Sequence, residues 1–303
     1  MDSATEGSVD EPEPKHNLSE FRPDPHAFVD CGRLWFRNPL TKSELAWLRE
    51  RCGGRKMYVH TRRARFDYQF VQRVTAFQPT TEALEWLARR NDILLNYVEI
   101  AFDWIFSSED DKQEAFTFVC EHLVKRYHRD QGIRFAGEDG FTRYTGPRGA
   151  PNLIAVYADL PSKVTGEVEC LHFDWRISGV ASLRRAGIRS VRDLLHLDHG
   201  AFWRERLVLC EINRRMLGRR HNNHALSTRR RRPWIVRCGR HFAYDMDLRA
   251  GSIIHRACGS TQGVVDRCRQ HFPLTGCLVP IDIGAVFPSV EDVITHTTSK
   301  YTS

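Results

Sequence analysis

Two short segments carry acidic and histidine side chains on one face of an alternating pattern. In "YVEIAFDW" (residues 97–104), alternation puts Glu99 and Asp103 on one face of a strand, and in "CLHFDWR" (residues 170–176) it puts His172 and Asp174 on one face. If the two strands are neighbours with these faces aligned, the four side chains converge. Three carboxylates and one imidazole suit Mg²⁺ or Mn²⁺, and the nitrogen favours Mn²⁺. The alternative interpretation is a polar sheet face exposed to solvent.

A tyrosine lies in a third strand-like segment, "NLIAVYADL" (residues 152–160). Alternation puts Tyr157 on a face with Leu153, Ala155 and Asp159, where its hydroxyl would be reachable. A phenol has a pKa near ~10, so it attacks a phosphate only with help from a metal or a nearby cation. Tyr157 is therefore either a nucleophile that the acidic cluster serves or a core tyrosine.

The arginines are concentrated in one part of the chain. The 303 residues carry a formal net charge of +7, whereas residues 204–240 alone hold twelve arginines against two acidic residues. A local charge larger than the net charge of the whole chain indicates a polyanionic partner, most simply nucleic acid; a solvated arginine run is the alternative. The candidate DNA-binding residues are Arg229, Arg230, Arg231, Arg232, Trp234, Arg237 and Arg240.

The compartment is expected to be cytoplasmic. The segment "MDSATEGSVDEPEPKHNLSE" has no apolar core like that of a secretory signal, and no apolar run approaches the ~18 residues of a membrane helix. Nine cysteines without a C-x-x-C pair indicate reduced, buried thiols rather than a disulfide framework or a zinc ribbon.

The order of the elements predicts an α+β fold, with a mainly antiparallel sheet of about five strands and helices packed on one face. Threonine and serine N-caps open two predicted helices, the second ending near Lys125, Arg126 and Arg129. Strands are expected within 31–36, 68–79, 94–106, 140–160 and 166–179, and helices within 80–92 and 107–130.

After Gly179 the sequence becomes helical and rich in arginine. Two short helices around Gly187 resemble a helix-turn-helix, and both DNA contact and plain packing are open for them. Four tryptophans are candidates to stack on bases or to fill the core, namely Trp104, Trp175, Trp203 and Trp234.

Three segments in order resemble the replication initiation factor family. These are rolling-circle initiators and related relaxases that lack the His-hydrophobic-His metal motif. "YTGPRGAPNLIAVY" is similar to the family's Y-x-G-x-R, spacer, Y pattern, "YVEIAFDW" to its preceding acidic strand, and "CLHFDWR" to its last strand. The resemblance covers about residues 90–180.

The resemblance implies a metal-dependent enzyme that nicks one DNA strand at an origin and holds it through a 5′-phosphotyrosine link. Tyr157 matches the nucleophile, Tyr144 a reserve nucleophile or stacking group, and Arg148 the arginine that stabilises the scissile phosphate. The metal-ligand candidates are Glu99, Asp103, His172 and Asp174. Two residues depart from the pattern: Asp159 stands where the family has a lysine, with Lys163 as its candidate replacement, and His172 replaces an acid.

This interpretation divides the chain into three parts: an acidic disordered segment (1–25), an α+β nicking domain (26–180) and a helical, basic DNA-binding region with a frayed tail (181–303). The expected partner is single-stranded or extruded origin DNA of a plasmid, phage or integrative element, and a helicase and a second copy of the chain are further candidates. A non-catalytic DNA-binding regulator on the same scaffold is the alternative function, and an RNA-binding module is a third.

Overall fold

The computed structural model describes residues 24–53, 57–61, 64, 67–125, 133–136, 142–147, 149–228 and 240–281. The segment expected to be disordered, 1–25, lies outside the described residues except for its last two, which begin the first strand.

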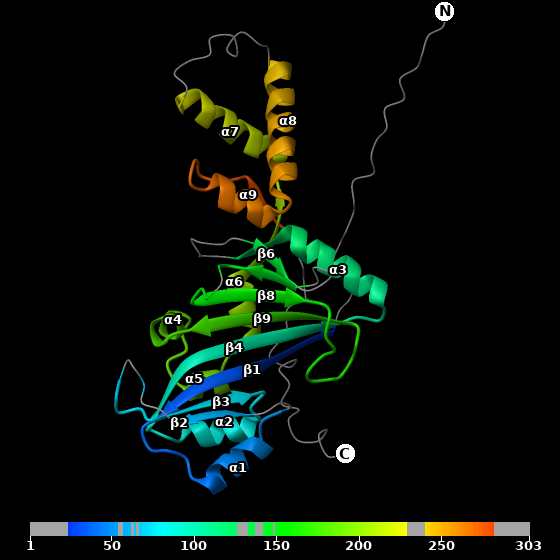
Figure 1. Ribbon diagram of the computed structural model, residues 1–303. Helices are drawn as coiled ribbons and strands as arrows, with labels where there is room; N and C mark the ends of the chain where they lie inside the picture. Colours follow the sequence, from blue (N-terminus) through cyan, green and yellow to red (C-terminus); the bar gives the residue numbers. More distant parts are fainter. Residues whose placement is uncertain are drawn as a thin grey trace, which may run out of the picture.

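An eight-stranded sheet forms the body of the molecule (Figure 1), and each of its pairings between described residues is antiparallel. This confirms the predicted α+β class. The strand order is β2 (Tyr58–Thr61), β3 (Gln72–Phe77), β1 (Asp24–Phe36), β4 (Ile93–Ile105), β9 (Cys170–Ser178), β8 (Asn152–Tyr157), β7 (Thr142–Thr145) and β6 (Ile133–Ala136).

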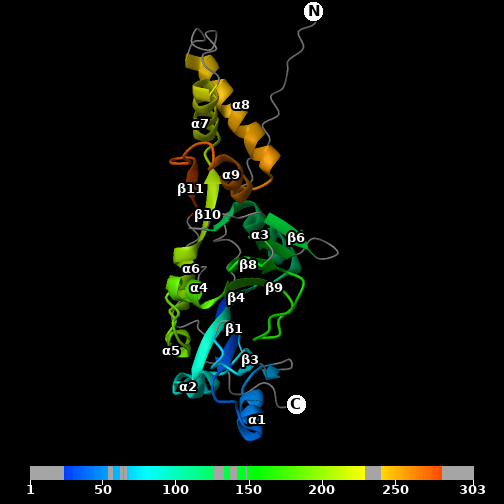
Figure 2. The same ribbon diagram turned by 60° about the vertical axis from the view of Figure 1, so that its left-hand side comes forward.

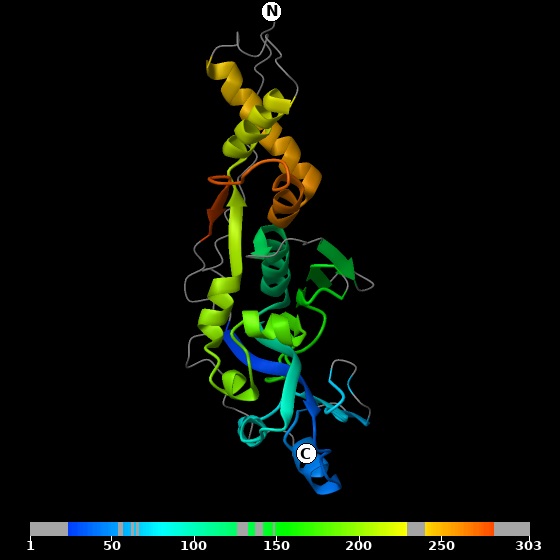
Figure 3. The same ribbon diagram turned by 90° about the vertical axis from the view of Figure 1, so that its left-hand side faces the viewer.

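Helices cover one face of this sheet, which carries the main core. Val98, Ile100 and Phe102 of β4 point to this face, as the alternation predicts, and pack with Phe173 and Trp203. In Figure 2 three short helices run along this side of the sheet, and Figure 3 shows the same side from another direction. They are α4 (Val180–Arg185), α5 (Val191–Leu195) and α6 (His199–Arg206). The polar residues of β4 and β9 are left on the opposite face.

The two predicted helix caps are present. Thr80 caps α2 (Thr81–Ala88) and Ser108 caps α3 (Glu109–His122), each through its side-chain oxygen. Thr41 caps a further helix, α1 (Lys42–Glu50), which the sequence analysis did not predict. The prediction that α3 continues to Lys125 is wrong, and Arg126 and Arg129 lie outside the described residues.

The early end of α3 has a structural cause. Leu123, Val124 and Lys125 form a short strand, β5 (Leu123–Lys125), which pairs with β10 (Leu207–Ile212). The fully buried guanidinium of Arg143 donates to the carbonyls of Val119 and Leu123, at the last turn of α3. Both contacts come from distant parts of the chain, so local capping signals could not predict them.

The residues after Gly179 belong partly to the sheet body. The turn between α4 and α5 contains Gly187 at φ +84°, and Leu183, Ile188 and Leu194 around it are buried against the sheet. The same core extends to Leu209, and a second core begins at Leu217. The expected division at residue 180 therefore falls inside the first core. The expectation that the chain is helical after Gly179 is wrong for 207–212, which form β10 between β5 and β11 (Leu278–Pro280).

Three helices form a separate layer beyond the β6 end of the sheet (Figure 1). They are α7 (Arg214–Thr228), α8 (Arg240–Cys258) and α9 (Thr261–Cys268). The α7–α8 crossing is tight, because a Cβ at Gly218 would lie 1.5 Å from the Asp247 carbonyl oxygen and one at Gly251 would lie 1.7 Å from that of Arg214. No helix in the described ranges is long and apolar enough to cross a membrane.

Three of the tryptophans proposed as stacking groups are core residues. Trp104, Trp175 and Trp203 are almost completely buried and pack with Phe102, Phe173 and Phe202. A base cannot reach them, so core filling is the correct interpretation for these three. Trp234 lies outside the described residues.

Candidate functional site

A bulge in β1 brings an unexpected carboxylate to the polar face. Val29 pairs with Ile100 and Cys31 with Glu99, so Asp30 is an extra residue between two ladder positions. Ala27 and Val29 on one side of the bulge, and Leu34 and Phe36 on the other, all belong to the core. The alternation therefore changes phase at Asp30, which joins the face that carries Glu99.

Three carboxylates gather at this point. One oxygen each of Asp30, Glu99 and Asp174 lies within 4.8 Å of the others; these three residues are called the carboxylate group below. They come from β1, β4 and β9, which are neighbours in the sheet. Two cations balance them in part: Lys163 Nζ lies 2.7 Å from Asp30, and Arg176 lies 3.2 Å from Asp174 and 3.6 Å from Glu99.

The carboxylate group is held under electrostatic strain. Burial and the charges of neighbouring carboxylates raise the pKa of Glu99 and of Asp174, and Arg176 opposes this shift in both. Tyr97 donates its hydroxyl proton to Glu99. Three acids against two cations leave a net negative charge, which a further cation would neutralise.

Tyr157 points at this group. Its hydroxyl donates to Asp174 Oδ2 at 3.1 Å, and its ring stacks on that of His172 with centroids 4.5 Å apart. The residue is only 6% exposed. Burial, followed by the charges of Asp174 and Asp30, raises the pKa of the phenol far above its usual value. The hydroxyl is therefore protonated, and Asp174 is the acceptor in reach of its proton.

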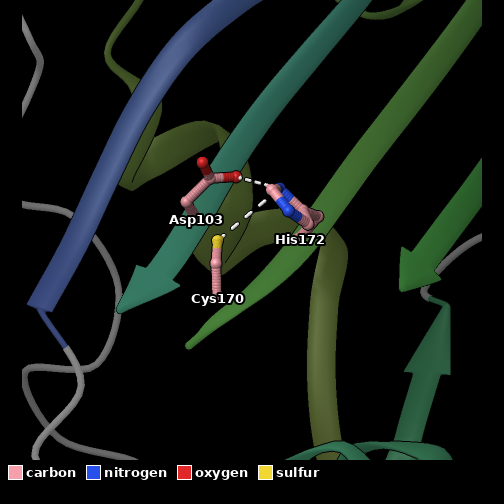
Figure 4. Close-up of side chains that lie close together, drawn as sticks. All are labelled: Asp103, Cys170 and His172. Atoms are coloured by element: carbon pink, nitrogen blue, oxygen red, sulfur yellow. Dashed lines mark hydrogen bonds and ion pairs between the residues drawn. The ribbon is translucent and has the colours of Figure 1, made fainter. Parts of the chain in front are cut away.

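A second group of ligand-type side chains lies one ladder position away (Figure 4). His172 Nδ1 lies 2.7 Å from Asp103 Oδ1, and Cys170 Sγ lies 3.7 Å from the same nitrogen. Asp103, Cys170 and His172 are called the histidine group below. The other ring nitrogen, Nε2, lies 2.7 Å from the Leu160 carbonyl oxygen.

The hydrogen bonds of the histidine group determine its charge state. Both ring nitrogens of His172 face acceptors, so both carry a proton and the ring is an imidazolium paired with Asp103. Burial is the largest single influence and opposes this charge, but the hydrogen bond and charge of Asp103, the Leu160 carbonyl and the charge of Asp174 together raise the pKa of His172. Ser162 donates to the other Asp103 oxygen at 2.7 Å. In this arrangement the imidazole has no lone pair for a metal.

The β8–β9 connection folds back over the site. Leu160, Ser162 and Lys163 come from this segment, and each contacts a residue on the sheet face. Lys163 Nζ lies 5.8 Å from the centroid of the Tyr157 ring. The residue expected to replace the missing lysine thus lies beside the expected nucleophile, and Asp159 is not among the contacts of either group.

The predicted site residues are therefore distributed as follows. Glu99, Asp174, Tyr157 and Lys163 meet at the carboxylate group, whereas Asp103 and His172 pair in the histidine group. Tyr144 lies beside them, with the Arg176 guanidinium carbon 6.0 Å from its ring centroid. The other candidates lie outside the described residues or have undescribed side chains: Arg148, Arg229, Arg230, Arg231, Arg232, Trp234, Arg237 and Arg240.

Five side chains of the two groups and their surroundings were not predicted: Asp30, Arg176, Ser162, Tyr97 and Cys170. Arg176 shares the alternating face of His172 and Asp174, and this spacing is the signal that could have found it. No such signal marks Asp30. The predicted strand begins at Cys31, which lies on the polar face, and strict alternation would put the preceding residue on the core face.

Comparisons with known proteins add little. No family model matches the chain, and no curated protein matches it. One similar solved structure is that of a rolling circle replication initiator protein from Geobacillus stearothermophilus, with 10% sequence identity and a TM-score of 0.37 over 62% of this chain and 87% of the other. A likeness of this size carries no argument about function.

Proposed function

We propose that the chain is a metal-dependent DNA nicking-joining enzyme, a rolling-circle replication initiator or relaxase, and that Tyr157 is its nucleophile. The observation that carries the proposal is the hydrogen bond from the Tyr157 hydroxyl to Asp174 within a group of three carboxylates and two cations. A tyrosine in this setting has a proton acceptor in contact and cations beside it, which are the aids that a phenol needs to attack a phosphate.

The donor set fits a hard divalent cation. The three carboxylates converge from a rigid sheet, and oxygen ligands of this kind suit Mg²⁺ or Mn²⁺. Burial, together with neighbouring carboxylates, raises the pKa of Glu99 and Asp174, and a bound cation would oppose this shift. We therefore assign the metal to Asp30, Glu99 and Asp174, and a supporting role to Asp103 and His172. When bound, the metal would withdraw charge from the scissile phosphate.

The residues of the chain would divide the reaction between them. The Tyr157 oxygen would form a bond to phosphorus as its proton passes to Asp174. The bond from phosphorus to the 3′-oxygen would break, and that oxygen would leave with the electron pair and take a proton from water to become a 3′-hydroxyl. Lys163 and Arg176, which pair with Asp30 and Asp174 in this structure, would supply positive charge to the phosphate oxygens. Arg148 is proposed to add a further positive charge, and Tyr144 to hold a base or to act as a reserve nucleophile.

The test uses single-stranded oligonucleotides tiled across the DNA that flanks the gene of this protein, each labelled at one end. With Mn²⁺ or Mg²⁺, a 3′-labelled oligonucleotide should move with the protein on a denaturing gel, and a 5′-labelled one should give a shorter free product. Tyr157→Phe should abolish both products, and Tyr144→Phe is the matched control. An adduct that survives Tyr157→Phe and is lost in Tyr144→Phe contradicts the assignment.

The arginine-rich segment is proposed to grip the DNA backbone. Arg229–Arg232, Arg237 and Arg240 would neutralise phosphates, with Trp234 against a base. The support is the sequence, together with exposed Arg214, Arg215 and Arg219 on α7 just before that segment. Replacing Arg229–Arg232 by alanine should lower the slope of log K against log salt by about 3 to 4 for a duplex, since each phosphate contact contributes about 0.9. An unchanged slope contradicts this role.

One observation favours a second candidate, a DNA-binding regulator without chemistry. Tyr157 is nearly buried, and the basic side chains beside it are already paired with carboxylates. Such a regulator would bind DNA with strong salt dependence and form no adduct with any of the tiled oligonucleotides, with or without metal.

A further inference from the structure

The polar face of the sheet carries a row of aromatic and arginine side chains that leads away from the carboxylate group. Arg33 lies opposite Tyr97, Thr75 lies opposite Arg33, and Tyr58 lies opposite Thr75, so one ladder row runs across β4, β1, β3 and β2. One row nearer the site, Phe77, Cys31, Glu99 and Arg176 lie opposite one another in turn. The six residues called the belt below are Tyr144, Arg176, Tyr97, Arg33, Phe77 and Tyr58.

Three ring contacts join members of the belt in pairs. Arg33 stacks on Tyr97 with its guanidinium carbon 4.6 Å from the ring centroid, and Arg176 lies 6.0 Å from the ring of Tyr144. At the edge of the sheet Tyr58 and Phe77 meet edge to face, with centroids 5.8 Å apart. From β2 to β7 the belt crosses six strand spacings, roughly 29 Å.

The belt is partly accessible, and one of its two arginines, Arg33, has no acidic partner among the described residues, whereas Arg176 is paired with Asp174 and Glu99. Tyr58 is 51% exposed on the edge strand, and Arg33, Tyr97, Phe77 and Arg176 are partly exposed. Within the described residues, Arg33 forms no ion pair, and its buried Nε has no hydrogen-bond partner. The rings of the belt belong neither to the main core, which lies on the opposite face, nor to the small core of Trp35, Ala64 and Phe70.

We propose that the belt is a track for single-stranded DNA, which extends the Tyr157 site across the sheet toward β2. Aromatic faces stack on bases of any sequence, and arginines between them neutralise the phosphates; this is the usual chemistry of single-strand binding. A duplex keeps its base faces covered, so it cannot use such a row. The proposal rests on the proposed function in its choice of DNA, and it gives that site its substrate class: a single strand laid over strands β2 to β7.

The test measures binding in the absence of chemistry. Full-length Tyr157→Phe protein is titrated, in Mg²⁺, into fluorescein-labelled oligothymidine of about 20 nucleotides and into a duplex of equal length, and anisotropy gives Kd. Tyr58→Ala should raise Kd for the single strand about fivefold to a hundredfold, as expected for the loss of one stacked base. Arg33→Gln should also raise it, by at least about threefold. Duplex affinity should change less than twofold in both.

Two further variants control for folding and for charge. Tyr58→Phe keeps the ring and should bind as the parent does. Arg184→Gln removes an exposed arginine of α4, on the helix-covered side, and should leave the single-strand Kd within twofold. Thermal unfolding midpoints confirm that the variants fold. If Tyr58→Ala and Arg33→Gln leave the single-strand affinity unchanged, the belt is not a track. If oligouridine binds tenfold more tightly than oligothymidine, the ligand of the belt is RNA and the proposal of a DNA track is wrong.

These outcomes are separable from those of the nicking assay. If Tyr58→Ala weakens single-strand binding but the wild-type protein forms no adduct, the track is supported and the nicking activity is contradicted. If the wild-type protein forms an adduct but its single-strand affinity does not depend on Tyr58 and Arg33, the nicking activity is supported and the track is contradicted.

Discussion

The carboxylate group and the histidine group lie side by side on the same sheet face, yet they differ in what satisfies them. In the histidine group each charge has its partner: the imidazolium bonds Asp103 and a carbonyl, and Asp103 also accepts from Ser162. In the carboxylate group three acids share two cations from partly exposed side chains. Three ligand-type residues that lie close together can therefore bind a metal only when their lone pairs are not already engaged in hydrogen bonds.

The largest expected loss of stability comes from removing one partner from the histidine group. Asp103→Asn leaves a buried imidazolium without its counter-charge, so the free energy of unfolding should fall by about 3 to 5 kcal/mol. Denaturant unfolding measures this loss, and His172→Gln in the same background should recover part of it. Mn²⁺ affinity measured below the unfolding transition should stay as in the wild type; a hundredfold loss of affinity would make Asp103 a ligand.

Two buried histidines are expected to make the free energy of unfolding depend on pH in opposite directions. Burial lowers the pKa of His199 to about 4, and the described residues offer no hydrogen-bond partner to its Nδ1. The free energy of unfolding should therefore fall by about 3 kcal/mol as the pH drops from about 6.5 to 4, because the buried His199 ring resists protonation. The raised pKa of His172 acts oppositely: its stabilisation is complete below about 6.5 and is lost as pH rises through the raised value.

Urea unfolding at a series of pH values separates the two histidines. His199→Phe should remove the acid-side loss, and His172→Asn should remove the loss on the alkaline side. If both variants keep the wild-type profile, the assignment of charge states to the two rings is wrong.

A substitution in the carboxylate group is expected to change the free energy of unfolding less than Asp103→Asn does, but to change the activity more. Asp30→Asn removes one ligand, so Mn²⁺ affinity and adduct formation should fall about a hundredfold, equivalent to about 2.7 kcal/mol. Stability should hold or rise, because one of three repelling charges is gone. Calorimetric titration with Mn²⁺ gives the affinity, and Glu50→Gln on α1, an exposed acid, is the matched control. Full affinity in Asp30→Asn would take Asp30 out of the site.

The smallest effect is expected at Cys170, the remaining member of the histidine group. Burial raises the pKa of this thiol, so it stays protonated and is a poor ligand. Cys170→Ala should cost about 1 kcal/mol of stability through the lost contacts and should leave metal binding and adduct formation unchanged. A loss of metal affinity in this variant would reverse the roles of the two groups.

The sequence predicts much of this fold from alternation and capping. The faces of β4 and β9 follow directly from period-two patterns, and Thr80 and Ser108 begin their helices as expected. The failures have one cause, which is long-range pairing. Lys125 leaves its expected helix because it pairs with Leu207, 82 residues away. The rest of β10 is held as a strand by the remaining pairs to β5 and by β11, which pairs with residues 210–212.

The site was predicted in part for the same reason. Tyr157, Glu99, Asp174 and Lys163 converge as their spacing or family pattern indicates, whereas Asp30 enters through a bulge that only the register between β1 and β4 reveals. The split between the two groups depends on hydrogen bonds to Leu160 and Ser162, in a connection with no periodic pattern. Spacing gives the face of a residue, and tertiary contacts decide its charge state.

The central claim is that the Tyr157 oxygen, facing Asp174, forms the bond to DNA. The direct measurement is to trap the protein on a cleaved single strand in Mn²⁺, digest it with protease and nuclease, and identify the modified peptide by mass spectrometry. The account predicts a nucleotide attached through its 5′-phosphate to Tyr157 in the peptide that contains "NLIAVYADL". A nucleotide on Tyr144, or on any other residue, would contradict it.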